Sequence, residues 1–323
     1  MKSFEYAAPA TLKEATALLS DKWGETEIMA GGTDLVTSLK QQLTAPSRVV
    51  SLRNISEIKG LQTADKTLRI GATTTLGELA ADKTVKEHFP ALVTAAQGVG
   101  SPQLLAVGTV GGDLCQRPRC WYYRNGFGLF GKDGNTSLVR EGDNRYHAIF
   151  GNDGEALFVC PSSLGPALVA LGATVVVAGP KDKRKVPAAE FFRTPKNAEE
   201  RETALKPNEI LAEIELPIGA LKNATYEVRH RHGLDWPYAT ASVAFQLKGG
   251  AVSDARVVLG HVAPVPWPAP DAAKALSGAK ADAASAAKCG EAAAQGAKPL
   301  SKNGYKIQLV KVAVKRAVLA AAA

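Results

Sequence analysis

The sequence predicts an α+β fold in two successive parts. Over residues 1–178, short β-branched segments alternate with stretches of helical periodicity. Beyond residue 178, several consecutive segments alternate apolar and polar residues with no helix between them, which is typical of an antiparallel sheet. We therefore expect a boundary near residue 178, between one domain over 1–178 and a second over 179–323. The second ends in an amphipathic helix with an apolar stripe of Ile307, Val310, Val314 and Val318.

The first part is predicted to hold strands at 26–29, 48–52, 68–71 and 174–178. Apolar residues at helical spacing predict helices over 11–19, 35–43, 76–81, 84–97 and 166–171. Thr11 with Glu14 and Thr84 with Glu87 have the spacing of capping boxes, in which each side chain satisfies a free backbone N–H. Residues 113–160 are polar, aromatic and irregular, and a connection of this length is usually functional or disordered.

The second part is predicted to hold strands at 210–216, 226–229, 241–247 and 256–262. Residues 269–298 are rich in Ala, Lys and Gly and have a helix-forming composition. The charged run Lys181–Lys185 comes just after a predicted strand. We interpret it as the solvated tip of a hairpin rather than as a nucleic-acid patch.

Composition limits the classes of protein that this chain can be. Apolar residues make up 46% and charged residues 22%, which predicts a folded core. The net charge of +8 is spread along the chain, so no nucleic-acid partner is expected. No apolar run approaches the roughly 18 residues of a membrane span. Because the first residues carry no apolar export segment, we expect a cytoplasmic protein, with co-export to the periplasm on a signal-bearing partner as the alternative.

A glycine pair follows the strand predicted at 26–29, in the segment Met29-Ala30-Gly31-Gly32-Thr33-Asp34-Leu35. Paired glycines allow backbone angles that other residues resist, and they let a ligand approach the main chain. Successive N–H groups in such a turn can hold an anion, helped by the following helix, and Thr33 adds a hydroxyl donor. On spacing alone, phosphate binding and a plain strand-to-helix turn remain equal alternatives.

A second segment, Gly108-Thr109-Val110-Gly111-Gly112-Asp113, repeats the arrangement of threonine, glycine pair and carboxylate. Two such loops in one domain favour a diphosphate ligand. Neither loop matches a Rossmann fingerprint or a Walker loop, so a nucleotide here would be bound by another fold. The sequence also lacks the nucleophile elbow and the zinc-protease motif, which removes support for a hydrolase.

The cysteines indicate neither a metal site nor a disulfide framework. Four cysteines in 323 residues exclude a disulfide-built scaffold. Their spacing matches no zinc or iron–sulfur pattern, so no metal site is predicted and free thiols are expected at Cys115, Cys120, Cys160 and Cys289. The aromatic run Trp121-Tyr122-Tyr123 is interpreted as a satellite core under the long loop, or else as a surface for a partner or a cover over a redox centre. No side chain is singled out as a catalytic acid or base.

Together these segments resemble the FAD-binding (medium) subunit of the xanthine dehydrogenase and carbon monoxide dehydrogenase family of molybdenum hydroxylases. The resemblance extends nearly end to end. Besides the two glycine loops, it rests on Phe4-Glu5-Tyr6, Gly71-Ala72-Thr73-Thr74, Pro161-Ser162-Ser163, Glu190-Phe191-Phe192 and the segment from Leu259 to Trp267.

The resemblance implies a two-lobed FAD-binding domain of the vanillyl-alcohol-oxidase-like type, followed by a smaller α+β domain. Main-chain N–H groups of the two glycine loops would hold the FAD diphosphate. The implied cofactor-binding residues are Met29, Ala30, Gly31, Gly32, Thr33, Asp34, Leu35, Val99, Gly108, Thr109, Gly111, Gly112, Asp113, Ser163 and Leu211. The family often has Asn where this chain has Asp113, Asp where it has Ser163, and Arg-Asn where it has Leu105-Ala106.

The resemblance also implies partners: a molybdopterin-binding large subunit and a [2Fe-2S] small subunit, from which electrons pass to the FAD and on to an external acceptor. The long loop, with Cys120, is similar to that of a subgroup including aldehyde oxidoreductases, in which this loop holds a [4Fe-4S] cluster. The remaining ligand positions fall near Leu129, Ser137 and Ala156, so no cluster is expected. The alternatives are a flavin-deficient scaffold subunit of such a complex and a stand-alone FAD oxidoreductase.

Overall fold

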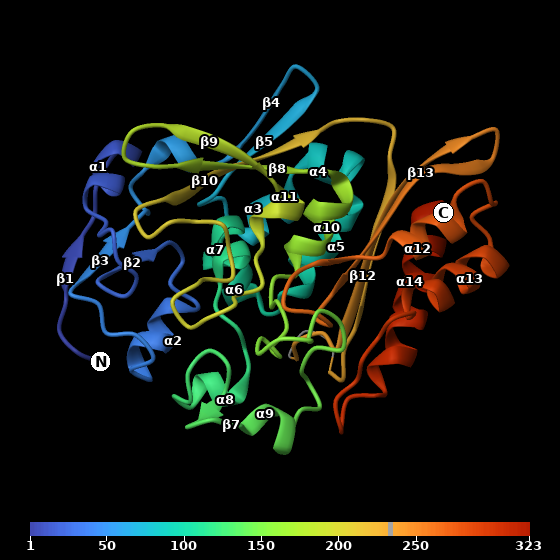
Figure 1. Cartoon of the computed structure of the whole chain (residues 1–323). Helices are drawn as coiled ribbons and strands as arrows, with labels where there is room; N and C mark the ends of the chain where they lie inside the picture. Colours follow the sequence, from blue (N-terminus) through green and yellow to red (C-terminus); the bar gives the residue numbers. More distant parts are fainter. Residues whose placement is uncertain (232–234) are drawn as a thin grey trace.

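A small parallel sheet forms the N-terminal lobe of the computed structural model, which describes residues 1–231 and 235–323 (Figure 1). Its strand order is β1 (Glu5–Ala7), β3 (Arg48–Ser51), β2 (Thr26–Met29). Helices α1 (Leu12–Ala17) and α2 (Leu35–Lys40) follow the two outer strands. The central strand carries the fully buried Val49 and Val50, as expected for a strand with neighbours on both sides.

The second sheet is larger and antiparallel. Its order is β4 (Leu61–Ala64), β5 (Thr67–Gly71), β10 (Ile210–Pro217), β8 (Thr174–Ala178) and β9 (Lys183–Pro187). The shared core beneath it is built with helices α3 (Leu76–Ala81), α4 (Lys83–His88), α5 (Pro90–Gly98), α6 (Pro102–Val107), α7 (Val110–Cys115), α10 (Leu164–Leu171) and α11 (Ala188–Phe191). A 3-10 helix, η1 (Ser56–Ile58), precedes β4.

The domain boundary expected at residue 178 cuts through this second sheet. Strand β8 ends at residue 178, yet β9 pairs with β8, and β10 lies between β8 and β5. The charged run lies in the hairpin of β8 and β9, but only Lys181 and Asp182 are in its turn, whereas Lys183, Arg184 and Lys185 belong to β9. Beyond residue 178, the strands first change sheet between β10 and β11. The sequence does not show this change, because consecutive antiparallel strands do not reveal which sheet they join. We therefore place the boundary at residues 218–221.

Helix caps agree with the sequence only in part. Thr11 caps α1 by accepting from the Glu14 N–H, but the Glu14 carboxylate accepts from the N–H of Ala10, not of Thr11. The cap predicted at Thr84 is wrong, because α4 already begins at Lys83. Asp82, two residues earlier, caps that helix by accepting from the Val85 N–H.

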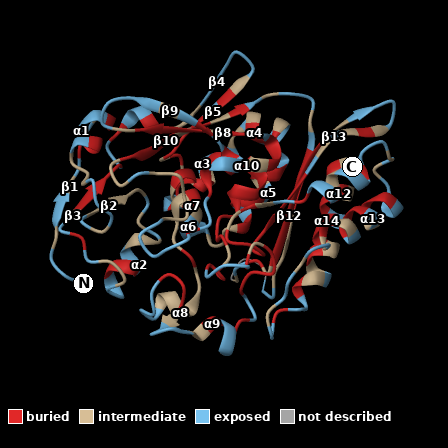
Figure 2. Ribbon diagram, in the orientation of Figure 1, coloured by how far each residue is buried: buried red, intermediate tan, exposed pale blue. Residues whose placement is uncertain are grey.

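The C-terminal sheet is antiparallel, as predicted, with the order β11 (Lys222–Val228), β12 (Ala239–Lys248), β13 (Ala251–Gly260) and β14 (Trp267–Pro268). Helices α12 (Pro270–Leu276), α13 (Ala283–Ala293) and α14 (Lys306–Ala322) cover one face. Helices α5 and α10 of the first part lie against the other face (Figure 1). Both faces are therefore covered, and Figure 2 shows most of β12 as buried.

The long loop lies beside both parts (Figure 1). It contains only the short elements α8 (Trp121–Arg124), β6 (Lys132–Asp133), β7 (Thr136–Ser137) and α9 (Leu138–Glu141). A separate apolar cluster of Leu129, Phe130, Ala156 and Phe158 lies inside it, with Cys120 packed against that cluster. A satellite core under the loop is thus present, although the run Trp121-Tyr122-Tyr123 itself is only half-buried.

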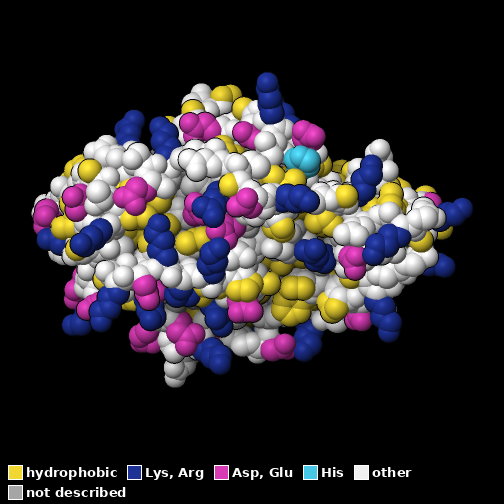
Figure 3. Space-filling view, turned by 90° about the horizontal axis from the view of Figure 1, so that it is seen from above, with side chains coloured by type: hydrophobic (Ala, Val, Ile, Leu, Met, Phe, Trp, Pro, Cys, Tyr) yellow, Lys and Arg dark blue, Asp and Glu magenta, His cyan; other side chains and the backbone are white. Residues whose placement is uncertain are grey.

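The surface carries charges of both signs. Figure 3 shows Lys and Arg side chains scattered among Asp and Glu over the face that it presents. Within the described residues, no helix combines the length and the apolar character needed to cross a membrane.

Phe245 tests the C-terminal core, because its ring is fully buried in β12. Phe245→Ala is expected to lower the free energy of unfolding by about 3–5 kcal/mol, through lost burial and the cavity that remains. Leu247→Ala, two residues along the same strand where the side chain is 42% exposed, should change it by less than about 0.5 kcal/mol. Urea denaturation measures both, and equal effects would contradict this core.

Candidate functional site

The two glycine loops meet in one cleft, between the small parallel sheet and the second sheet. The cleft has a volume of about 600 Å³. It brings together most of the predicted cofactor-binding residues: Ala30, Gly31, Gly32, Thr33, Asp34, Leu35, Thr109, Gly111, Gly112 and Leu211. Segments separated by more than a hundred residues in the chain therefore line the same space.

Gly31 is the point where the two loops touch. A Cβ atom at Gly31 would lie 1.8 Å from the carbonyl oxygen of Val107, so only glycine allows this approach. Gly111 is similarly close to Ala72, with a Cβ contact of 2.9 Å. Gly32 has a φ of +75°, which favours glycine for a different reason. The glycine pairs thus serve loop packing and backbone conformation together.

The first loop has free main-chain donors. Within the described residues, the N–H groups of Gly31, Gly32, Thr33 and Asp34 donate no hydrogen bond to another protein group. The second loop differs, because the Gly111 N–H donates to Ala72 O at 2.8 Å and the Gly112 N–H to Thr109 Oγ1 at 3.1 Å. The first loop therefore offers the free donors that a bound anion would need, since unpaired N–H groups need an acceptor.

The carboxylate of Asp34 faces the chain rather than open solvent. Its Oδ1 accepts from the guanidinium groups of Arg119 at 3.0 Å and Arg124 at 2.8 Å. Its Oδ2 accepts from the N–H of Arg117 at 2.8 Å. Arg124 also donates to Ser38 Oγ at 3.0 Å, so the segment 117–124 is tied to the first loop and to α2. Asp34 lines the cleft, but its charge is already neutralised.

Asp113 and Ser163 lie outside the cleft lining and are buried together. The Asp113 carboxylate accepts from the Ser162 hydroxyl at 2.5 Å and from the Leu164 N–H at 3.0 Å, and a longer contact of 3.4 Å reaches the Ser163 N–H. These bonds hold the start of α10. Burial raises the pKa of Asp113 to about 6, against the lowering effect of the three hydrogen bonds. Asp113 therefore points away from any diphosphate in the cleft.

Three other predicted residues also lie outside the cleft lining. Met29 ends β2, with its side chain near Gly32. Val99 caps α5 and packs on the main core. Gly108 lies between Leu104 and Leu76, where a Cβ would be 2.7 Å from the Leu104 oxygen.

Sequence patterns did not reveal the far wall of the cleft. Trp23, Tyr123 and Arg201 line it, and the Arg201 guanidinium lies 4.9 Å from the Trp23 ring centroid. Arg201 comes from an irregular stretch between β9 and β10, and Trp23 from a turn before β2. A cation–π contact of this kind has no fixed sequence spacing, so no periodicity could have pointed to it.

Two family descriptions together cover almost the whole chain. The FAD binding domain in molybdopterin dehydrogenase matches residues 2–219, and the CO dehydrogenase flavoprotein C-terminal domain matches residues 224–321. The chain belongs to the FAD-binding subunits of the molybdopterin dehydrogenases. The predicted family is thereby confirmed, and its cofactor is FAD.

Relatives of this family are similar to the chain in sequence and in fold. The aldehyde oxidoreductase FAD-binding subunit PaoB of Escherichia coli is 30% identical, over 83% of this chain and 84% of that protein. The carbon monoxide dehydrogenase medium chain of Hydrogenophaga pseudoflava is 29% identical, over 81% and 75%. The solved structure of quinoline 2-oxidoreductase from Pseudomonas putida 86 matches with a TM-score of 0.78 and 27% identity, covering 100% of this chain and 98% of that one.

The long loop does not fit an iron–sulfur cluster. Of the four positions implied by the resemblance, only Cys120 is a cysteine, and Leu129 and Ala156 are part of the apolar cluster against which it packs. Within the described ranges, no three His, Cys, Asp or Glu residues gather in a way that could hold a metal ion. An iron–sulfur cluster at this place would require the buried apolar cluster to open.

The contact at Gly31 can be tested with one methyl group. Gly31→Ala is expected to force the two loops apart, at a cost of about 1–3 kcal/mol for overpacking. FAD affinity should fall about tenfold or more, because the free N–H groups of the first loop are displaced. Thermal denaturation and FAD titration measure the two effects. Gly219→Ala is the matched control, since its Cβ would meet no heavy atom within 4 Å.

Asp113 predicts a pH dependence of stability. Its pKa is raised to about 6 in the folded protein, above the unfolded value, so the folded protein binds the extra proton between these values. Stability from this group is therefore full at low pH and is lost as the pH rises through about 6. Asp113→Asn should remove this decrease in the free energy of unfolding. Denaturation of both proteins at several pH values from about 4 to 7 measures it. Identical pH profiles for both proteins would contradict the buried carboxyl.

Proposed function

We propose that this chain is the FAD-binding electron-transfer subunit of a heteromeric molybdenum hydroxylase, with the cofactor in the cleft between the two lobes. The observation that carries the proposal is the row of free N–H groups at residues 31–34, placed where two glycine loops meet. When bound, FAD supplies the redox chemistry by which electrons arriving from partner centres leave for an external acceptor.

In this proposal the first glycine loop holds the diphosphate through its main chain. Most acidic residues of the cleft are ion-paired: Asp34 with Arg119 and Arg124, Glu202 with Arg117, and Glu209 with Arg184 at 2.7 Å. Among the described residues, Glu27 accepts only from the Thr44 hydroxyl at 3.1 Å. Thr109 adds its hydroxyl, whose oxygen already accepts from Gly112 and whose proton is free to be donated. Leu211 supplies an apolar contact from β10.

We propose that the partners are a molybdopterin-binding large subunit and a [2Fe-2S] small subunit. Support comes from family membership and from two relatives described as medium chains or FAD-binding subunits, which are names for one chain of a larger enzyme. The substrate pocket of the whole enzyme then belongs to another chain.

Assembly in the cytoplasm is proposed, with co-export on a partner as the alternative. All four cysteines are free thiols, and Cys160 and Cys289 are buried. Free thiols suit a reducing compartment. Fractionation of cells that make the whole complex separates the two outcomes.

An absorption spectrum of the purified chain, before and after the addition of FAD, tests the function. Flavin bands at one FAD per chain, bleached by a reductant and restored by an acceptor, are expected. A chain that takes up no FAD from an excess would overturn electron transfer and leave the flavin-deficient scaffold.

Two substitutions at Thr33 test the main-chain cradle. Thr33→Pro removes one N–H donor and should weaken FAD binding about tenfold or more. Thr33→Ala keeps that donor and should remain within about threefold of the parent protein. FAD titration measures both, and thermal denaturation confirms folding. An alanine variant as weak as the proline variant would assign recognition to the hydroxyl instead.

A further inference from the structure

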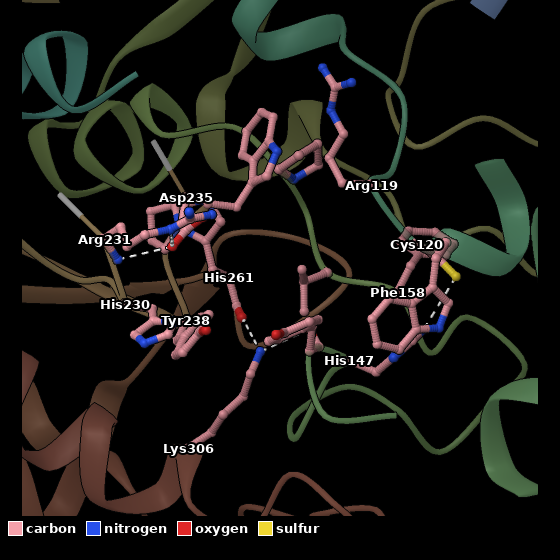
Figure 4. Close-up of a pocket in the computed structure, with 16 residues that line it drawn as sticks. Arg119, Cys120, His147, Phe158, His230, Arg231, Asp235, Tyr238, His261 and Lys306 are labelled. Atoms are coloured by element: carbon pink, nitrogen blue, oxygen red, sulfur yellow. Dashed lines mark hydrogen bonds and ion pairs between the residues drawn. The ribbon is translucent and has the colours of Figure 1, made fainter. Parts of the chain in front are cut away.

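A second pocket lies between the long loop and the C-terminal domain (Figure 4). Its volume is about 280 Å³, and it shares no lining residue with the cleft. The long loop contributes Cys120, Trp121, Tyr146 and His147, while the C-terminal part contributes Trp236, Tyr238, His261 and Lys306. The function proposed above uses none of these side chains.

Lys306 places a buried ammonium group at this pocket. The residue is 1% exposed and reaches in from the start of α14, as Figure 4 shows. Its Nζ donates to the backbone oxygens of His261 at 2.8 Å and Tyr146 at 3.0 Å. An ammonium group has three N–H donors, and within the described residues the third has no acceptor. Nor does any described carboxylate form an ion pair with Lys306.

The other charges at the pocket are already paired. Arg119 is neutralised by Asp34 at 3.0 Å, and Arg231 by Asp235 at 3.0 Å. Lys306 is therefore the charge that lacks a counter-ion in this part of the described chain. A buried cation without an opposite charge is costly, and burial accordingly lowers the pKa of Lys306 to about 7.

Two buried histidines leave ring nitrogens unused at the same pocket. His261 is 1% exposed, and its Nδ1 pairs with Thr240 Oγ1 at 2.9 Å, while Nε2 has no partner among the described residues. His147 contacts Cys120 Sγ through Nε2 at 3.2 Å, and its Nδ1 is unpartnered in the same described set. The backbone oxygens of Pro161 and Asn144 are acceptors near these two rings, and the unpartnered ring nitrogens leave hydrogen-bonding capacity that a polar ligand can use.

The walls are aromatic. The rings of Trp121 and Tyr146 lie edge to face at 5.3 Å, and Tyr146 lies 5.3 Å from Tyr238. Trp236 stacks under the Arg119 guanidinium at 4.7 Å, and it is 42% exposed at the mouth of the pocket. Flat apolar surfaces of this kind favour a planar aromatic ligand.

We propose that this pocket binds a small aromatic carboxylate, with the carboxylate on Lys306 and the ring between the aromatic walls. The size of the pocket suits one aromatic ring rather than a nucleotide. The charge-assisted bond to Lys306 supplies the missing counter-ion, and a ring nitrogen of His261 or His147 can donate to the second carboxylate oxygen. The site goes beyond the proposed flavin function and does not require it.

Isothermal titration of the full chain with benzoate tests the site, at about pH 6, where the Lys306 ammonium is protonated. Benzoate should bind. Benzyl alcohol, which lacks the carboxylate, and cyclohexanecarboxylate, which lacks the aromatic ring, should each bind about tenfold more weakly or worse. The titration is run with flavin-free and FAD-loaded protein. Binding in both samples keeps the result independent of the flavin function.

Lys306→Met should weaken benzoate binding about tenfold or more, whereas Lys302→Met, at an exposed lysine of the same segment, should not change it. Trp236→Ala removes the exposed wall and should also weaken binding, which keeps the test decisive if the buried Lys306 variant misfolds. Circular dichroism checks each fold. The proposal is overturned if millimolar benzoate gives no binding heat, or if benzoate binds a folded Lys306→Met protein as it binds the parent.

Discussion

The carboxylate of Asp34 fixes the position of the segment 117–124 against the first glycine loop, and both cavities depend on that contact. It accepts from the guanidinium groups of Arg119 and Arg124 and from the Arg117 N–H, all within 3.0 Å. On one side the same loop offers its free N–H groups to the cleft. On the other side Arg119 stacks on Trp236 at the mouth of the second pocket. Removing a partly buried carboxylate would leave two cations uncompensated, so this contact is hard to replace.

The carboxylate of Asp113 also holds two segments of the chain together. Asp113 follows the second glycine loop, yet it holds the start of α10 and points away from the cleft. Both loop carboxylates are thus engaged inside the protein, which supports the proposal that the main chain of the first loop holds the diphosphate. An aspartate at the position where the family often has asparagine is therefore compatible with FAD, provided that it stays in this buried network.

The sequence predicted the elements better than their assembly. Apolar periodicity located β10, β12 and α14, because the buried positions of a strand or helix are apolar and recur with the period of that element. The boundary at residue 178 failed because β9 and β10 return to the second sheet, and strand pairing over such distances leaves no local signal. Repetition of the two glycine loops predicted a shared site. The buried role of Asp113 and the second pocket could not be foreseen, since Lys306 and His147 meet only in the folded chain.

Hydrogen exchange of the segment 116–124 measures what Asp34 does. In the parent protein the Arg117 N–H is bonded to the carboxylate, and exchange across the segment should be slow. In Asp34→Asn, loss of the charge should release Arg119 and Arg124, and exchange in this segment should rise about tenfold or more while α14 stays unchanged. If the segment exchanges equally slowly in both proteins, Asp34 does not hold the two cavities in place.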